Sequence, residues 1–198
     1  MKKLFVISSL LLLVACSSNA PVETQTNTQY NPENQARVRL YGQAGHPIFA
    51  WYGINCEDRR QSRGTKIIVG GGIKSLGSLA GVAKSQSIGI PETEISRNIG
   101  EQNGIMSRAF FQEITVPAGL PMNVQSKISG HRNQAGNVVY HSSGCLSTMG
   151  SFVPQAGHDY EVVGAKGACG VAAFDIAQDG NITPVELNDR AICYKRRR

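Results

Sequence analysis

Residues 36–43, ARVRLYGQ, decide the fold that we expect for this chain. The apolar Val38 and Leu40 alternate there with Arg37 and Arg39. Alternation with a period of two residues is typical of a β-strand, because successive side chains of a strand point to opposite faces. We therefore predict a strand over this stretch.

Further strand-like stretches follow, separated by turns such as PAG (117–119) and QDGN (178–181). Short strands with glycine-rich turns predict an antiparallel sandwich or barrel. We favour an all-β antiparallel β-sandwich over residues 36–194 that resembles immunoglobulin-like domains. Tyr160 heads a strand after a glycine-containing turn and looks like the tyrosine that anchors the corner of such sandwiches. The predicted strands are GHPIFAWYGINC (45–56), TKIIVGGG (65–72), RAFFQEITVP (108–117), MNVQSKISGHRN (122–133), NVVYHSS (137–143), SFVP (151–154), DYEVVGAK (159–166), CGVAAFDIA (169–177), ITPVEL (182–187) and AICYK (191–195).

Residues 70–104 depart from this pattern, being rich in Gly and Ser. Leu76, Leu79, Val82 and Ala83 would share one face of a helix, although each glycine in a helix costs about 1 kcal/mol. We predict a short helix or an irregular insertion here.

The first residues of the chain read as an export signal. Lys2 and Lys3 precede an apolar run over 4–15, which is shorter than the roughly 20 residues of a membrane-spanning helix. LVAC (13–16) resembles the lipobox of bacterial lipoproteins. The resemblance implies that residues 1–15 are a signal peptide, and that Cys16 carries lipid chains and anchors the protein in a membrane. Ser17 after it implies the outer membrane.

Residues 16–35 follow as the lipidated cysteine and a flexible tether. They contain no Leu, Ile or Phe, so they cannot bury enough apolar surface to fold alone. The 19 residues after Cys16 would span on the order of 25 Å as a random coil. The mature region, through RVRLYGQ, YGINC, FFQEITVPAG and SFVPQAGHDYEV, also resembles a recurrent type of proteobacterial lipoprotein. This resemblance implies location and fold and brings no activity with it.

The remaining cysteines are even in number, which predicts two disulfides in an oxidising compartment. Three pairings are possible. We favour Cys169–Cys193 with Cys56–Cys145, because a hairpin turning at Asp179-Gly180 would bring the first two together if its strand bulges near Asn188. The alternative is Cys145–Cys169 with Cys56–Cys193.

Positive charge gathers at the two ends of the chain. The net charge is +6, but Lys2 and Lys3 belong to the leader, and the tail 195–198 consists of Lys195, Arg196, Arg197 and Arg198. The body between them is near neutral, so no nucleic-acid-binding face is indicated. The tail is a candidate contact for anionic membrane headgroups.

Two patterns suggest metal sites, and neither is complete. Residues 175–186 resemble a calcium loop, but Ala177 stands at a ligand position and Pro184 interrupts the loop, so a hairpin turn explains them better. His131 and His141 flank a turn and would face each other, although zinc requires three or four ligands. We expect no metal and no cofactor.

Aromatic residues offer one candidate binding surface. Phe49 and Trp51 share a face of the predicted strand 45–56. Aromatic platforms bind sugars, but a tryptophan in a sandwich is more commonly part of the core, and we favour the core.

The sequence shows no catalytic constellation such as Gly-x-Ser-x-Gly. We therefore expect a non-enzymatic binding or structural domain held at the outer membrane, with an envelope protein or glycan as its partner. One alternative is an envelope hydrolase acting on peptidoglycan or peptides through residues of 70–104. Another is a small-ligand carrier with an apolar cavity between its sheets.

Overall fold

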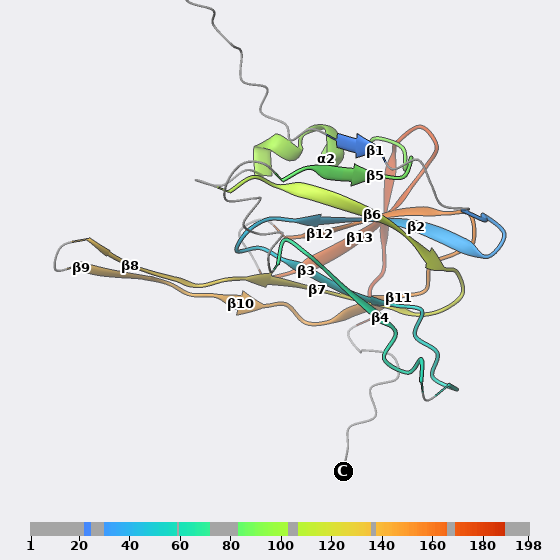
Figure 1. Ribbon diagram of the computed structural model, residues 1–198, viewed down its shortest axis with the longest axis horizontal. Helices are drawn as coiled ribbons and strands as arrows, with labels where there is room; N and C mark the ends of the chain where they lie inside the picture. The colour runs from blue at the N-terminus through green and yellow to red at the C-terminus, as the bar shows by residue number, and fades with distance from the viewer. Residues whose placement is uncertain are drawn as a thin grey trace, which may run out of the picture.

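The computed structural model describes residues 22–24, 30–58, 60–71, 83–102, 107–135, 138–165 and 169–188. Two β-sheets pack face to face in it (Figure 1). The predicted all-β antiparallel sandwich is therefore confirmed. Among the described residues, no helix is both long and apolar enough to cross a membrane.

The first sheet has the strand order β1-β5-β6-β2-β12-β13-β14. Its strands are β1 (Val22–Thr24), β2 (Gln35–Gly42), β5 (Ser85–Ser87), β6 (Phe110–Pro117), β12 (Asp159–Gly164), β13 (Val171–Ile176) and β14 (Ile182–Val185). The second sheet has the order β10-β7-β3-β4, with β11 also paired to β7. Its strands are β3 (Ile48–Tyr52), β4 (Thr65–Val69), β7 (Met122–Ile128), β10 (Cys145–Leu146) and β11 (Gly150–Phe152).

The core lies between the two sheets and follows the alternation of their strands. Val38 and Leu40 of β2 are fully buried and face the second sheet, where Ala50 and Val124 meet them in one apolar cluster. The arginines of β2 consequently point to the outer side of the first sheet. Which face is apolar was thus encoded in residues 36–43.

Tyr160 occupies the corner position that the sequence suggested. Its ring is buried in the core, and its hydroxyl oxygen accepts a hydrogen bond from the backbone N–H of Gln155 over 3.0 Å. A tyrosine that holds the backbone a few residues upstream is the device expected at such a corner. The sequence-based interpretation of Tyr160 is confirmed.

The described part of the predicted insertion, residues 83–102, adds β5 to the first sheet and then crosses the outer side of that sheet. It contains β5, the helix α2 (Glu94–Arg97) and the 3₁₀-helix η1 (Ile99–Gln102). Thr93 begins α2 by accepting from Ser96 N, and Ser96 Oγ accepts from Thr93 N in return. Leu76, Leu79 and Val82, which were predicted to share a helical face, lie outside the described residues.

A two-stranded ribbon, β8 (His131–Ala135) and β9 (Val138–Ser142), extends away from the sandwich (Figure 1). It continues β7 and β10, and Gly130 and Gly144 lie side by side where the ribbon leaves the sandwich. A Cβ on Gly130 would lie 2.7 Å from the backbone nitrogen of Gly144. Only glycine therefore fits at these two positions without a shift of the backbone.

The predicted tether differs from expectation in its described part. Val22–Thr24 form β1, which pairs in parallel with β5 at the edge of the first sheet. Residues 30–34 form a turn that leads into β2, with the Arg37 guanidinium 4.7 Å from the Tyr30 ring centroid. Composition alone missed these contacts, because a segment poor in apolar residues can still add backbone hydrogen bonds to a sheet edge.

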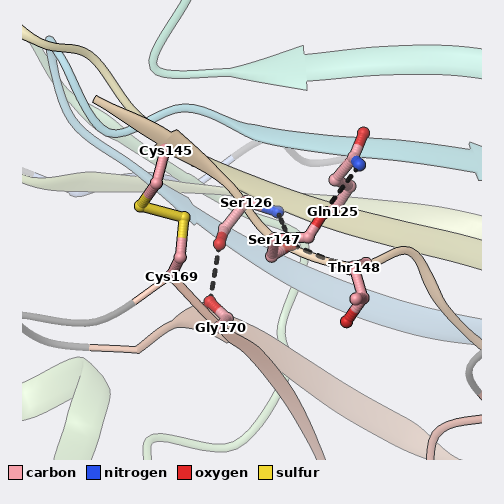
Figure 2. The surroundings of a disulfide bond; sticks show 7 residues. All are labelled: Gln125, Ser126, Cys145, Ser147, Thr148, Cys169 and Gly170. Atoms are coloured by element: carbon pink, nitrogen blue, oxygen red, sulfur yellow. Dashed lines mark hydrogen bonds between the residues drawn. A yellow bond between two sulfur atoms is a disulfide. The ribbon is translucent and has the colours of Figure 1, made fainter. Parts of the chain in front are cut away.

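The disulfide pairing that we favoured is wrong. Cys145 of β10 is bonded to Cys169, just before β13, with a Cα–Cα distance of 5.9 Å (Figure 2). The hairpin of β13 and β14 does turn at Gly180, but the chain then leaves the first sheet and Asn188 pairs with Ser151 of β11. By Asn188 the chain therefore no longer runs beside β13.

One half of the alternative pairing, Cys145–Cys169, is confirmed. Cys56 is also disulfide-bonded. Its predicted partner Cys193 lies outside the described residues, so Cys56–Cys193 stays a prediction.

Candidate binding face

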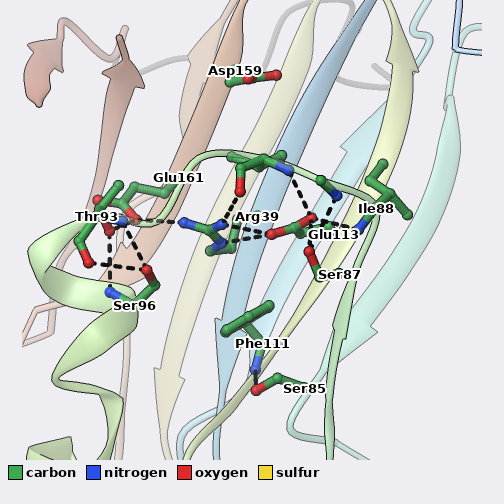
Figure 3. Close-up of polar contacts among 12 residues, drawn as sticks. Arg39, Ser85, Ser87, Ile88, Thr93, Ser96, Phe111, Glu113, Asp159 and Glu161 are labelled. Carbon is green, nitrogen blue, oxygen red and sulfur yellow. Dashed lines mark hydrogen bonds and ion pairs between the residues drawn. The ribbon is translucent and has the colours of Figure 1, made fainter. Parts of the chain in front are cut away.

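The outer side of the first sheet carries charged side chains at its centre (Figure 3). The strand register places Arg39 of β2 between Glu113 of β6 and Glu161 of β12. Arg39 Nε and Nη2 donate to Glu113 Oε1 over 2.9 and 2.7 Å, and Nη1 lies 3.7 Å from Glu161 Oε2. None of the three side chains is more than 1% exposed. With the neighbouring Tyr41 and Phe111, which are also buried, we call these residues the covered face.

Residues 87–90, at the end of β5 and in the loop after it, complete the hydrogen bonding of Glu113. Glu113 Oε2 accepts from Ser87 Oγ over 2.9 Å and from the backbone N–H of Ile88 and Ile90. The Ile90 carbonyl accepts from Arg39 Nη2 over 3.0 Å. A carboxylate with this many donors can be buried, because its hydration is replaced by fixed partners.

Glu161 is held by two hydroxyl groups. Thr93 Oγ1 donates to its Oε2 over 2.8 Å, and the Tyr41 hydroxyl donates to the same oxygen over 3.0 Å. Burial raises the pKa of Glu161 above its ordinary value, although these hydrogen bonds and Arg39 act in the opposite direction. Burial and the Glu161 carboxylate likewise raise the pKa of Tyr41.

The side chains of the covered face are buried, so this face offers no surface to a substrate. The hydrolase hypothesis requires a nucleophile and a base beside residues 70–104, and Thr93 with Glu161 has that spacing. Both side chains are fully buried, so no substrate reaches them in this structure. Within the described ranges, Arg39 Nη1 and Glu161 Oε1 have no hydrogen-bond partner, and Nη1 makes only the 3.7 Å ion pair with Glu161 Oε2.

The outer side of the second sheet is different. Phe49 and Trp51 of β3 point outward, since Ile48 and Ala50 between and before them are buried in the core. Both rings are partly exposed, and neither belongs to a core cluster of the described residues. Our preference for a core tryptophan is therefore wrong, because β3 has apolar residues on both faces and alternation alone does not tell which face is inside.

A lysine lies over this aromatic pair. The ring centroids of Phe49 and Trp51 are 6.3 Å apart with an interplanar angle of 22°. Lys66 of β4 pairs in register with Trp51, and its Nζ lies 5.5 Å from the Phe49 centroid and 5.3 Å from the Trp51 centroid. Ile68, opposite Phe49, is 37% exposed beside them.

Amide side chains of β7 border the rings on the other side. The register pairs Trp51 with Asn123 and Phe49 with Gln125. Asn123 is only 6% exposed, yet its Oδ1 has no hydrogen-bond partner in the described part of the chain. Gln125 Nε2 donates to the Ser147 carbonyl over 2.9 Å (Figure 2). We call Phe49, Trp51, Lys66, Ile68, Asn123 and Gln125 the open face.

The suspected calcium loop is a β-hairpin turn. β13 and β14 are antiparallel across residues 177–181, where Ala177 N donates to the Asn181 carbonyl and Gly180 adopts φ 82°. Asp175 instead accepts from His158 Nδ1 at 2.7 Å. In the described ranges, no three His, Cys, Asp or Glu side chains gather closely enough to hold a metal ion.

The two ribbon histidines are not cross-strand partners. His131 pairs with Ser142, and Arg132 pairs with His141, so they are one position out of register. Their predicted juxtaposition across the hairpin is wrong. Turn length, which sets the register of a hairpin, decides this and could not be inferred from two histidines alone.

Several predicted site residues lie outside the described part of the chain. They are Cys16, Cys193, Lys195, Arg196, Arg197 and Arg198. Conversely, sequence reasoning missed Arg39, Glu113 and Glu161 as a set. Their only signal was Arg37 and Arg39, which alternate with the apolar Val38 and Leu40 and were used only to predict a strand.

Comparison of the chain with protein-family models, with curated proteins and with solved structures found no match.

Proposed function

We propose that this chain is a lipid-anchored lipoprotein of the bacterial cell envelope whose sandwich is a non-enzymatic binding domain. Its binding surface is the open face. The observation that carries this proposal is the pair Phe49 and Trp51, which are partly exposed on the outer side of the second sheet. Aromatic side chains left at a surface are a mark of binding sites, since burying them on contact supplies much of the binding energy.

The anchor follows from Cys16 and from the short connection to the sandwich. Only five residues, 17–21, separate Cys16 from β1, so the first strand stays within about 20 Å of the lipidated cysteine. β1 lies at the edge of the first sheet, on the side away from the second sheet (Figure 1). An anchor at that edge would turn the open face away from the membrane and toward the compartment in which a partner is found.

The anchor is tested by changing Cys16. The unmodified chain is expected to sediment with outer membranes, to resist alkaline extraction, and to yield an amino-terminal peptide that carries three acyl chains. Cys16→Ala should remain at precursor mass without lipid. An unlipidated Cys16 in the mature chain would overturn the anchor.

The binding surface is tested by photocrosslinking in intact envelopes. A benzophenone amino acid is placed at position 49 on the open face, and at position 94 in α2 as a matched exposed control. Position 49 should give a discrete adduct, protein or glycan, that is absent from position 94 and is lost when Trp51→Ala is added. Equal labelling from both positions would contradict a dedicated binding face.

A further inference from the structure

We infer that the open face binds an acidic saccharide, with a sugar ring stacked on Phe49 and Trp51 and a sugar carboxylate paired with Lys66. This inference rests on the proposed function and names the chemistry of the partner. It follows from the shape, the charge and the unmet hydrogen bonding of the open face, each of which favours the same class of ligand.

The shape comes from two rings on one strand. Phe49 and Trp51 are two residues apart on β3 and project on the same side, which gives nearly parallel rings 6.3 Å apart. Two such rings make an extended apolar surface of the breadth of a pyranose ring or two. The C–H faces of sugar rings pack on such surfaces, whereas their hydroxyls need polar groups at the rim.

The charge comes from two lysines on the outer side of the second sheet. On β3, β4 and β7, the outward positions carry Lys66 and Lys127 and no carboxylate. Lys66 has no ion-pair partner among the described residues, and its Nζ is almost equally distant from the two rings. A cation at this place favours a ligand that brings its own anion to the ring faces.

The unmet hydrogen bond belongs to Asn123. This side chain lies beside Trp51, and its buried Oδ1 accepts from no group among the described residues. A buried acceptor without a donor costs about 1–3 kcal/mol. A saccharide hydroxyl supplies the missing donor once a neighbouring side chain moves aside, so binding would recover part of that cost.

Two kinds of sugar supply both the ring and the carboxylate, namely uronic acids and muramic acid. The probes are therefore tetragalacturonate, its fully methyl-esterified form, and the disaccharide of N-acetylglucosamine and N-acetylmuramic acid. Each is titrated into the detergent-solubilised full chain at low salt. Trp51 is the single tryptophan of the chain, so its fluorescence reports on the open face alone.

We expect a saturable change in Trp51 fluorescence with at least one acidic probe. The methyl ester should bind at least tenfold more weakly than tetragalacturonate, because it keeps the rings and loses the carboxylates. Lys66→Met should weaken the acidic probe about tenfold and leave the ester unchanged. Arg97→Met in α2 removes a cation from the opposite side of the molecule and should change neither.

Calorimetry of Trp51→Ala supplies an independent measurement, with circular dichroism to show that the variant is folded. Loss of binding in the folded variant supports stacking on this ring. Equal affinity for acid and ester overturns the role of the carboxylate. A response to vesicles of anionic lipid but to none of the saccharides overturns the saccharide.

Failure of this inference can be told apart from failure of the proposed function. If no saccharide binds but position 49 still forms its discrete photoadduct, the open face binds a partner of another class and only the saccharide is refuted. If both experiments fail, the proposed binding function is refuted as well.

Discussion

The outer sides of the two sheets differ in which side chains are buried and which are exposed. On the first sheet, the outward-facing Arg39, Glu113 and Glu161 are buried beneath residues 83–102. On the second sheet, the outward-facing Phe49 and Trp51 stay partly exposed. The charged face is thus the covered one, and the aromatic face is the open one, which reverses what solvation alone would favour.

This reversal tells which face has a structural role. A covered charged face is stable only when every charge finds partners, and Glu113 meets that condition through three donors from residues 87–90 and two from Arg39. The exposed part of an uncovered aromatic face does not stabilise the isolated molecule, because it is still in contact with water. Its burial becomes favourable when a ligand covers it, and this is why we place binding there.

The largest effect should follow removal of the central cation of the covered face. Arg39→Met leaves Glu113 and Glu161 buried without a counter-charge, and we expect a loss of about 3–5 kcal/mol in the free energy of unfolding. Lys127→Met removes a cation from the exposed outer side of the second sheet and should cost less than about 1 kcal/mol. Urea denaturation of the two variants measures both. Similar losses would mean that the two outer sides do not differ in the way described.

The disulfide should come next, because it ties the two sheets together. Cys145 and Cys169 enclose a separation of 24 residues, for which the loop-closure model gives about 3 kcal/mol. In the Cys145→Ser, Cys169→Ser double variant, hydrogen exchange should accelerate in β7 and β10, while β2 and β6 stay protected. Uniform acceleration in both sheets would show that the open-face sheet has no separate stability.

The local pattern of the sequence was enough for the strands and not for their surroundings. Alternation in residues 36–43 was enough to predict β2 and to place Val38 on its apolar face, because side-chain direction is a property of the strand itself. It could not show that residues 83–102 return to cover Arg39, since this depends on contacts about fifty residues apart.

The same limit explains two of the wrong predictions, the core tryptophan and the cysteine pairing. Ile48 and Ala50 alternate with Phe49 and Trp51, so β3 is apolar on both faces and its neighbours decide which face is buried. The cysteine pairing depended on the path after Val185, where Asn188 crosses to β11 instead of following β13. In both cases the deciding contact lies between segments that are distant in the sequence.

The pH dependence of stability offers a smaller test of the covered face. Because the pKa of Glu161 is raised in the folded protein, the fold binds its proton more tightly than the unfolded chain does. The contribution of Glu161 to stability is therefore most favourable below its unfolded pKa and falls as pH rises through its folded pKa. The fall amounts to about 1.4 kcal/mol for each unit by which the pKa is raised.

Glu161→Gln should remove this fall, since the amide oxygen still accepts from Tyr41 and Thr93 but carries no charge. Urea denaturation from pH 4 to pH 8 is expected to show the variant gaining stability relative to the unmodified protein as pH rises. Glu94→Gln in α2 changes an exposed carboxylate and serves as the control. Parallel curves for Glu161→Gln and the unmodified protein would contradict the raised pKa.

The smallest effect on stability should come from the open face, where Lys66 lies over two rings. Lys66→Met removes a cation–π contact that is worth about 0.5–1 kcal/mol at an exposed site, and a methionine still covers part of the rings. Quenching of the single tryptophan is the sharper measurement. Iodide should quench Trp51 more strongly than caesium in the unmodified protein, because Lys66 attracts the anion, and Lys66→Met should reduce this preference while unfolding hardly changes. If instead neither ion quenches Trp51, the ring is shielded in solution, and the contrast between a covered face and an open face would not hold.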